Sequence, residues 1–234
     1  MKFESAEFFP TPVKLLDKIT DGLDWRMVNS VLEPSAGRGD MAQYVMEQYE
    51  KVMRDKKLDL DCIELDRELQ NVLKGYGYRV VHDDFMTFHT FKKYSLIIMN
   101  PPFSAGAAHL TKALDMQKDG GGVICILNAE TIRNPYTNER KTLVRRLTEL
   151  GADIRCFLPD TVKKLTGKWS RKNRLLLMIS RARKVMGKRF PKRRILFMTL
   201  DQPFPCWGMD NIPNESAIIG GERSLVWKNW HCYM

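Results

Sequence analysis

Along the chain, short apolar segments alternate regularly with longer amphipathic ones. Seven segments have the composition of β-strands: residues 30–33, 59–65, 78–85, 94–99, 121–127, 153–158 and 174–182. Between them, apolar residues keep helical spacing over residues 40–53, 66–74, 104–117 and 139–150. Several of the strands are apolar throughout, which suits a sheet that is covered on both faces. The pattern therefore predicts an α/β fold with a doubly wound, mostly parallel, seven-stranded sheet.

The periodic pattern fades near residue 183, which divides the chain into two expected parts. We predict an α/β domain over residues 1–182 and a basic, aromatic-containing C-terminal extension over residues 183–234. The first twelve residues lack the apolar core of a signal peptide, and no apolar run approaches the ~18 residues of a membrane span. The five cysteines show no spacing typical of a disulfide framework or metal site. We expect a soluble cytoplasmic protein without a membrane partner or a metal.

The net charge of +10 is concentrated in one stretch of the chain. Residues 163–194 contain fourteen lysines or arginines and no acidic residue, so the other 24 basic residues are outnumbered by the 28 acidic ones elsewhere. A basic strip of this kind is a candidate surface for a nucleic-acid backbone, and an aromatic ring within it offers a surface for base stacking. The predicted contacts are Lys168, Trp169, Arg171, Lys172, Arg174, Lys188 and Arg189. The alternative is a solvated charged face without a partner.

An unusual motif ends the strand predicted at 94–99, where the chain reads Asn100-Pro101-Pro102-Phe103. The two prolines fix their φ angles, remove two backbone donors and favour an extended conformation for the residue before them. Asn100 and the carbonyl of Pro101 are therefore held rigidly at the carboxyl end of the strand. A stiff turn without further function is the alternative interpretation.

The strand predicted at 30–33 ends in a glycine turn, "EPSAGRGD". Gly37 and Gly39 allow a tight turn and a close approach of a ligand to the backbone, just before the amino terminus of a helix. Gly37, Gly39 and Ala42 also satisfy a dinucleotide-binding fingerprint, with Glu64 as the ribose ligand, so a dehydrogenase is one alternative. Glu33 disfavours it, because a carboxylate beside the turn would repel a pyrophosphate and attract a cationic ligand.

Acidic residues also follow the next two predicted strands. Glu64 stands where a carboxylate can accept hydrogen bonds from ribose hydroxyls, and Asp84 precedes the aromatic residue Phe85. A carboxylate beside a flat apolar ring suits an adenine with an exocyclic amine. Each acid alone is equally explained as a surface helix cap. Because the carboxyl ends of parallel strands meet at one edge of a sheet, we expect these features to form a single pocket.

The motifs, taken in order, resemble those of a known enzyme family. The segments "FFPTP" (8–12), "VLEPSAGRGD" (31–40), "CIELD" (62–66), "DDF" (83–85) and "NPPF" (100–103) are similar to those of the N6-adenine methyltransferases that depend on S-adenosylmethionine. The resemblance extends from residue 8 to about residue 182. It implies a Rossmann-like class I methyltransferase fold, S-adenosyl-L-methionine as the cofactor, and a catalytic domain at 1–182.

The resemblance also implies roles for individual residues. The cofactor-binding residues would be Thr11, Pro12, Glu33, Ser35, Ala36, Gly37, Gly39, Glu64, Leu65, Asp84, Phe85 and Asn100. The catalytic residues would be Asn100, Pro101, Pro102 and Phe103. In this interpretation Asn100 and Pro101 accept hydrogen bonds from the target amine, and Phe103 stacks on the target base.

The resulting hypothesis is a DNA methyltransferase that modifies the exocyclic amine of a flipped-out adenine. Specific DNA enzymes with this motif order usually carry a large recognition domain, whereas only about 50 residues follow the last predicted strand. Recognition is therefore expected from the loops at 128–140 and 159–173 and from the basic tail. The alternatives are adenine methylation in RNA, methylation of a protein glutamine, and a catalytically silent nucleic-acid-binding module. The histidines at 82, 89, 109 and 231 suggest only packing or surface roles.

Overall fold

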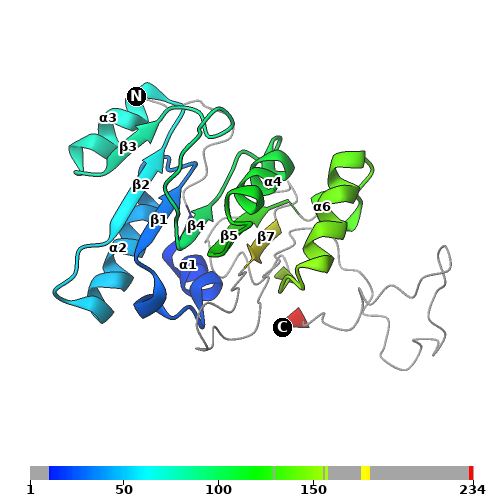
Figure 1. The fold of residues 1–234 in the computed structure, drawn as a ribbon, viewed down its shortest axis with the longest axis horizontal. Helices are drawn as coiled ribbons and strands as arrows, with labels where there is room; N and C mark the ends of the chain where they lie inside the picture. Colours follow the sequence, from blue (N-terminus) through cyan, green and yellow to red (C-terminus); the bar gives the residue numbers. More distant parts are fainter. Residues whose placement is uncertain (1–10, 129, 155, 158–174, 180–231, 234) are drawn as a thin grey trace.

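The main sheet of the protein is a mixed sheet (Figure 1). The computed structural model describes residues 11–128, 130–154, 156–157, 175–179 and 232–233. The sheet has the strand order β3-β2-β1-β4-β5-β7. Its strands are β1 (Ser30–Glu33), β2 (Asp59–Ile63), β3 (Arg79–His82), β4 (Leu96–Met99), β5 (Gly122–Leu127) and β7 (Leu175–Ile179). The first five strands are parallel and β7 is antiparallel to β5, which confirms the predicted mostly parallel sheet.

The number of strands differs from the prediction of seven. Within the described residues the main sheet has six strands, because β6 (Cys156–Phe157) pairs with β8 (Cys232–Tyr233) in a separate two-stranded sheet. The segment 153–158, "DIRCFL", carries two charged residues among its apolar ones. The place beside β5 is taken by the uniformly apolar β7, whose composition suits a sheet covered on both faces. The proposed boundary at residue 183 lies outside the described residues.

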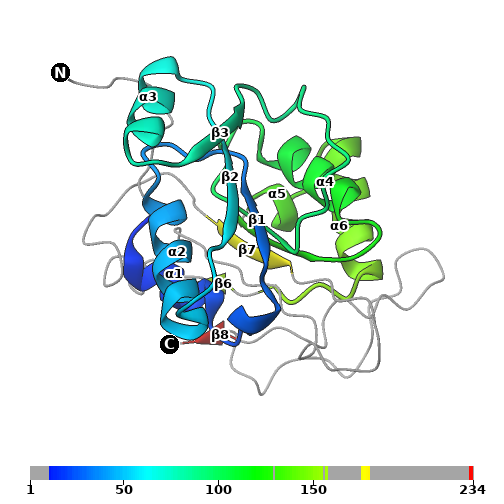
Figure 2. The ribbon, with the colours of Figure 1, turned by 60° about the vertical axis from the view of Figure 1, so that its left-hand side comes forward.

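Helices cover both faces of the sheet, as a doubly wound fold requires. Figure 2 shows α1 and α2 on one side of the strands and α4, α5 and α6 on the other. The four helices expected from the sequence are α2 (Asp40–Met53), α3 (Arg67–Gly75), α4 (Gly106–Met116) and α6 (Asn138–Glu149). Three further elements were not predicted from the sequence: α1 (Val13–Thr20), the short helix α5 (Glu130–Arg133) and the 3-10 turn η1 (Trp25–Met27).

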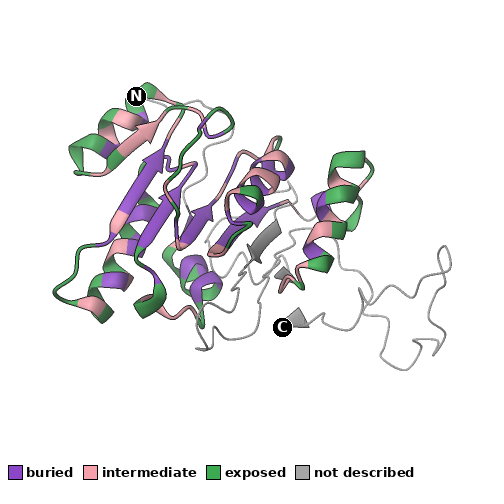
Figure 3. Ribbon diagram, in the orientation of Figure 1, coloured by how far each residue is buried: buried purple, intermediate pink, exposed green. Residues whose placement is uncertain are grey.

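The apolar strands pack their two faces into two separate clusters. On β4, Leu96 and Ile98 join the cluster formed with α1 and α2, whereas Ile97 and Met99 join the cluster formed with α4 and α6. Successive side chains of a strand point to opposite faces, so a strand between two helical layers has to be apolar at every position. Figure 3 shows the strands β1 and β4 buried along their whole length.

A buried ion cluster ties β2 to its neighbours. The Asp61 side chain is 2% exposed and accepts hydrogen bonds from Tyr94 Oη (2.8 Å), Lys92 Nζ (2.6 Å) and Arg79 Nε. Asp59, on the same strand, also pairs with Arg79 and Lys92. Burial opposes ionisation of Asp61, but the three hydrogen bonds outweigh it and lower the pKa below its ordinary value. The cluster therefore fastens β3 and the segment before β4 to the sheet.

The strand order creates a crevice at one edge of the sheet. From β1 the chain proceeds outward to β2 and β3, and then returns to form β4 on the other side of β1. In such sheets the loops after the two diverging strands separate, which leaves a space at their carboxyl ends. Glu33 ends β1 and Asn100 follows β4, so both residues lie at this crevice. None of the helices that the structure describes is long and apolar enough to cross a membrane.

Candidate active site

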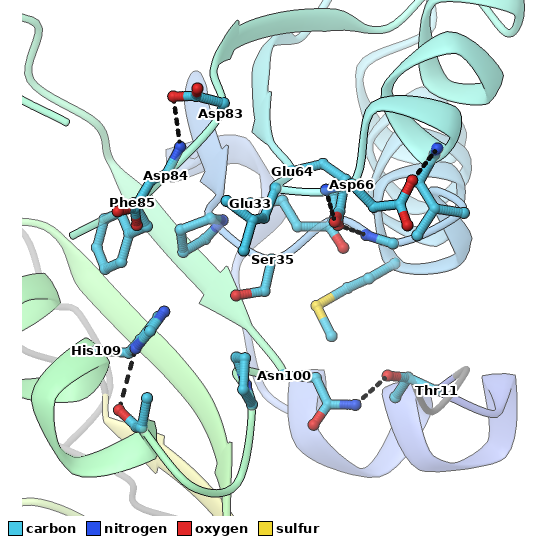
Figure 4. A pocket seen from close by; sticks show the side chains of 18 of the residues that line it. Thr11, Glu33, Ser35, Glu64, Asp66, Asp83, Asp84, Phe85, Asn100 and His109 are labelled. Carbon is cyan, nitrogen blue, oxygen red and sulfur yellow. Dashed lines mark hydrogen bonds between the residues drawn. The ribbon is translucent and has the colours of Figure 1, made fainter. Parts of the chain in front are cut away.

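A pocket of about 610 Å³ lies at the carboxyl ends of β1, β2, β3 and β4 (Figure 4). It brings together most of the residues that the sequence predicted for one site. Its lining includes Thr11, Glu33, Ser35, Ala36, Gly37, Glu64, Leu65, Asp84, Phe85, Asn100 and Pro102. These residues come from five separate segments of the chain.

Asn100 is hydrogen-bonded to the segment that precedes α1. Its amide Nδ2 donates to Thr11 Oγ1 at 3.2 Å. This contact joins two motifs that are 89 residues apart in the sequence. It also orients the Asn100 side chain, whose Oδ1 is buried, at the side of the pocket opposite Phe85. The two motifs identified separately in the sequence therefore form one wall.

Glu33 is an almost completely buried carboxyl group at the base of the pocket, with 2% exposure. It accepts a hydrogen bond from the backbone N–H of Ala42, and its Oε2 has no hydrogen-bond partner among the described residues. Burial, and then the negative charges of Asp40 and Glu64, raise the pKa of Glu33 well above its ordinary value. A cation bound in the pocket would supply the missing counter-charge.

Glu64 is oriented by backbone amides. Its Oε2 accepts from Gly37 N–H at 2.6 Å, and its Oε1 accepts from Asp66 N–H at 3.0 Å. The glycine turn is held at this position because Ala36 N–H donates to the carbonyl of Ile63, at the end of β2. A carboxylate can accept about four hydrogen bonds, so Glu64 retains the capacity to accept two more from a pair of hydroxyl groups.

The turn after β3 presents Asp84 to the pocket. Asp84 Oδ1 accepts from Met86 N–H at 2.8 Å, which fixes the carboxylate at the start of the turn. The adjacent ring of Phe85 is only 2% exposed, with Lys112 Nζ lying 5.3 Å from its centroid. Little of this ring is therefore available for stacking. Leu65, which is 73% exposed and also lines the pocket, offers the larger apolar surface.

Four predicted site residues lie near the pocket without lining it. Pro12 is the N-cap of α1, and its carbonyl accepts from the N–H groups of Leu15 and Leu16. Pro101 is buried, and Phe103 is half-buried against the apolar cluster formed with α1 and α2. A ligand in the pocket would therefore reach only the exposed part of the Phe103 ring. The fourth residue is Gly39.

Gly39 serves the packing of the turn. It is the N-cap of α2 with a φ of +91°, and a Cβ at this position would lie 3.0 Å from Leu73 Cδ2 and 3.1 Å from Tyr78 Cε2. A side chain would therefore be disfavoured both by the backbone conformation and by two neighbours.

Replacing Gly39 by alanine is expected to lower the free energy of unfolding by about 1 to 3 kcal/mol, because a non-glycine residue is strained at this φ. Urea unfolding followed by circular dichroism measures the change. Gly75→Ala is the matched control, since a Cβ there meets no atom within 4 Å and φ is not positive. Equal effects of the two substitutions would contradict the packing role of Gly39.

Other lining residues were not assigned from the sequence: Pro34, Asp40, Met41, Asp66, Leu69, Asp83, Ser104, Ala105 and His109. Several of them are next to predicted residues in the sequence, and this position was a signal from which they could have been predicted. His109, the fourth residue of α4, had no such signal. The predicted nucleic-acid contacts, from Lys168 to Arg189, lie outside the described residues. In the described part of the chain, no group of three histidine, cysteine or acidic residues is arranged to hold a metal ion.

No protein-family model matches the sequence, and no curated protein matches it significantly. Among solved structures, the chain is similar to a Listeria monocytogenes protein assigned to the class I S-adenosylmethionine-dependent methyltransferases, with a TM-score of 0.56 and 14% identity over 81% of this chain and 63% of that one. The chain has the class I methyltransferase fold.

A second methyltransferase-fold structure is a modification subunit assigned to a type I restriction enzyme of Vibrio vulnificus. The TM-score is 0.52 and the identity 15%, over 67% of this chain and 42% of that one. The chain therefore spans 42% to 63% of the length of these two structures. At such identities the similarity establishes the fold, and the chemistry has to be argued from the pocket.

Proposed function

We propose that the protein is an S-adenosylmethionine-dependent methyltransferase that modifies the N6 amine of adenine in DNA. One observation carries the proposal: a single pocket joins Asn100 of the Asn-Pro-Pro-Phe motif to the acidic residues at the ends of the three neighbouring strands. Each of these groups matches a different part of the reaction. The resemblance of the motifs to N6-adenine methyltransferases supports the same assignment.

The carboxylates suit the parts of S-adenosylmethionine. Glu64, oriented by two backbone amides, would accept hydrogen bonds from the ribose hydroxyls. Glu33 would face the cationic methionine moiety, and Asp84 would accept from the adenine amine, beside the exposed side chain of Leu65. When bound, the cofactor supplies an electrophilic methyl group on a positively charged sulfur. A dinucleotide is disfavoured because Glu33 would repel its pyrophosphate.

Asn100 and Pro101 would make the target amine more nucleophilic. The lone pair of an adenine amine is delocalised into the ring, which makes the nitrogen a poor nucleophile. Asn100 Oδ1 and the Pro101 carbonyl would accept the two hydrogens of the amine and favour the pyramidal geometry in which the lone pair is available. Holding the amine about 3 to 3.5 Å from the methyl group would lower the barrier further, without a strong base.

DNA is the proposed substrate because the order of the motifs resembles that of DNA enzymes more than that of RNA enzymes. The basic strip at residues 163–194 suits the phosphate backbone of either nucleic acid. The similarity in fold to a restriction-enzyme modification subunit agrees with this choice. In duplex DNA the target base would have to leave the stack before it reaches Asn100.

The test is transfer of a labelled methyl group to duplex DNA, single-stranded DNA and total RNA in parallel, with nucleoside mass spectrometry of each product. We expect N6-methyladenine in DNA, and a loss of at least about 100-fold for Asn100→Ala, because a preorganised polar group at the reacting amine is removed. Asn71→Ala, exposed on α3 and outside the pocket lining, is the matched control and should retain full activity.

The other outcomes distinguish the alternatives. Methylation confined to RNA would assign the same chemistry to a different nucleic acid. Cofactor binding without transfer to any of the three substrates would refute the proposed function and leave a protein substrate or a binding module. Unchanged transfer by the Asn100 variant would refute the role of the motif.

A further inference from the structure

His109 is a buried polar residue of the pocket to which the proposed function assigns no role. It lies on α4, is 8% exposed, and its ring lines the pocket. Figure 4 shows the ring directed into the pocket on the side of Phe85, with Asn100 and Thr11 on the opposite side. His109 therefore belongs to the part of the pocket that Asp84 and Phe85 define, rather than to the target-amine part.

The hydrogen bonding of the ring determines what it presents to a ligand. Nδ1 lies 3.0 Å from the carbonyl oxygen of Ala105, one helical turn earlier. A carbonyl oxygen can only accept, so Nδ1 carries the proton and donates it to this bond. In the neutral ring the lone pair is then on Nε2, the nitrogen on the pocket side, which makes Nε2 a hydrogen-bond acceptor.

The neutral form is favoured by the surroundings. Burial lowers the pKa of His109, and the positive charge of Lys112 on the same helix acts in the same direction. The carboxylate of Asp84, in the turn after β3, and the bond to Ala105 oppose this shift without reversing it. At neutral pH the pocket therefore contains two acceptors near each other, the Asp84 carboxylate and the His109 Nε2.

The position of His109 is fixed relative to the Asp84 turn. Its ring centroid lies 5.6 Å from that of Phe85, and Lys112 Nζ donates to the carbonyls of Met86 and Phe88, both at 2.8 Å. These contacts fasten α4 to the turn. A flat ligand bound beside Asp84 would thus meet the imidazole at a defined place.

Building on the proposed function, we propose that His109 Nε2 accepts a hydrogen bond from the exocyclic amine of the cofactor's adenine, whose second hydrogen is accepted by Asp84. The amine is the only group of an adenine base that offers two N–H donors. A purine with a carbonyl at the same position would instead present a lone pair to both acceptors. His109 is then a specificity residue that selects a 6-amino purine at this end of the pocket.

The experiment measures the binding of two ligands by calorimetry: S-adenosylhomocysteine and S-inosylhomocysteine, in which a carbonyl replaces the amine. Three proteins are compared, the wild type, His109→Asn and His109→Gln. The asparagine amide can still donate to Ala105 but has no atom at the position of Nε2. The longer glutamine amide reaches that position and can present its oxygen there.

We expect the wild type to prefer S-adenosylhomocysteine by at least about 100-fold, since a buried polar site rejects an analogue that cannot complete its hydrogen bonds. His109→Asn should bind it about 10-fold more weakly, the loss of one net hydrogen bond, and discriminate correspondingly less. His109→Gln should remain within about 3-fold of the wild type, because it restores the acceptor. Thermal melts of both variants establish that they are folded.

Four outcomes would overturn the inference or the function beneath it. Undiminished discrimination by a folded His109→Asn would refute the acceptor role, and an equal loss in the asparagine and glutamine variants would show that His109 acts through packing. No binding of S-adenosylhomocysteine by the wild type would refute the cofactor assignment and the inference together. Binding without methyl transfer to any nucleic acid would refute the proposed function alone.

Discussion

Replacing Glu33 by glutamine is expected to weaken S-adenosylmethionine binding by about 100-fold or more, because it removes the buried carboxylate that we propose to face the cationic part of the ligand. The same substitution should stabilise the protein without ligand. Glu33 is 2% exposed, and its Oε2 has no hydrogen-bond partner in the described part of the chain. Glutamine keeps an oxygen for the Ala42 N–H and removes the charge that burial opposes. We expect a gain of about 1 kcal/mol, or about 2 to 4 °C in Tm for a chain of this size.

The pH dependence provides an independent check. Burial raises the pKa of Glu33 in the folded state above its value in the unfolded chain. The folded state therefore binds the proton more tightly, and this contribution to stability is present at low pH and is lost as pH rises through the folded pKa. The difference in Tm between Glu33→Gln and the wild type should accordingly be larger at pH 8 than at pH 5.

Calorimetric titration with S-adenosylmethionine and thermal melts at the two pH values measure both effects. Glu50→Gln, on the exposed side of α2, is the matched control and should change neither. If the Glu33 variant bound the ligand as tightly as the wild type, the cationic part of the ligand would have to lie elsewhere in the pocket.

Replacing Asp61 by asparagine is expected to lower the free energy of unfolding by about 2 to 4 kcal/mol, since removing one partner of a buried ion pair leaves the other charges uncompensated. The expected loss of unfolding free energy is smaller than for a fully buried ion pair. The reason is that the side chains of Arg79 and Lys92 are 58% and 28% exposed and keep part of their hydration. Urea unfolding measures the change.

The wild type should also lose this contribution in acid. The hydrogen bonds to Asp61 lower its pKa in the folded state, so the stability that it contributes is complete above the unfolded pKa of about 4 and is lost as pH falls through the folded pKa. The asparagine variant should lack this part of the acid sensitivity. The matched control is Asp119→Asn, whose pair with Lys93 is exposed on both sides and should contribute less than about 1 kcal/mol. A similar loss in both variants would show that burial adds nothing to the cluster.

The sequence was sufficient for the features that depend on local pattern. Strands β1 to β5 follow from short apolar runs, and the meeting of Glu33, Glu64, Asp84 and Asn100 follows from parallel strands whose carboxyl ends share an edge. Features that depend on tertiary packing could not be predicted in this way. The pairing of β6 with β8, the half-buried position of Phe103 and the burial of Glu33 are set by contacts between segments far apart in the chain.

His109 illustrates the same limit in the site itself. A histidine on an amphipathic helix has no local feature that separates a packing role from a ligand-facing one. Its role emerges only from the Ala105 carbonyl on one side of the ring and the pocket on the other.

The attachment of α4 to the Asp84 turn through Lys112 also restricts how this protein can evolve. The helix begins six residues after Asn100 and carries His109 and Lys112 within its first two turns. A residue inserted or deleted within α4 before His109 would rotate both side chains by about 100° around the helix axis relative to the start of the helix. The number of residues from Asn100 to Lys112 therefore sets where His109 and Lys112 lie relative to Asn100. We expect this number to be inherited unchanged.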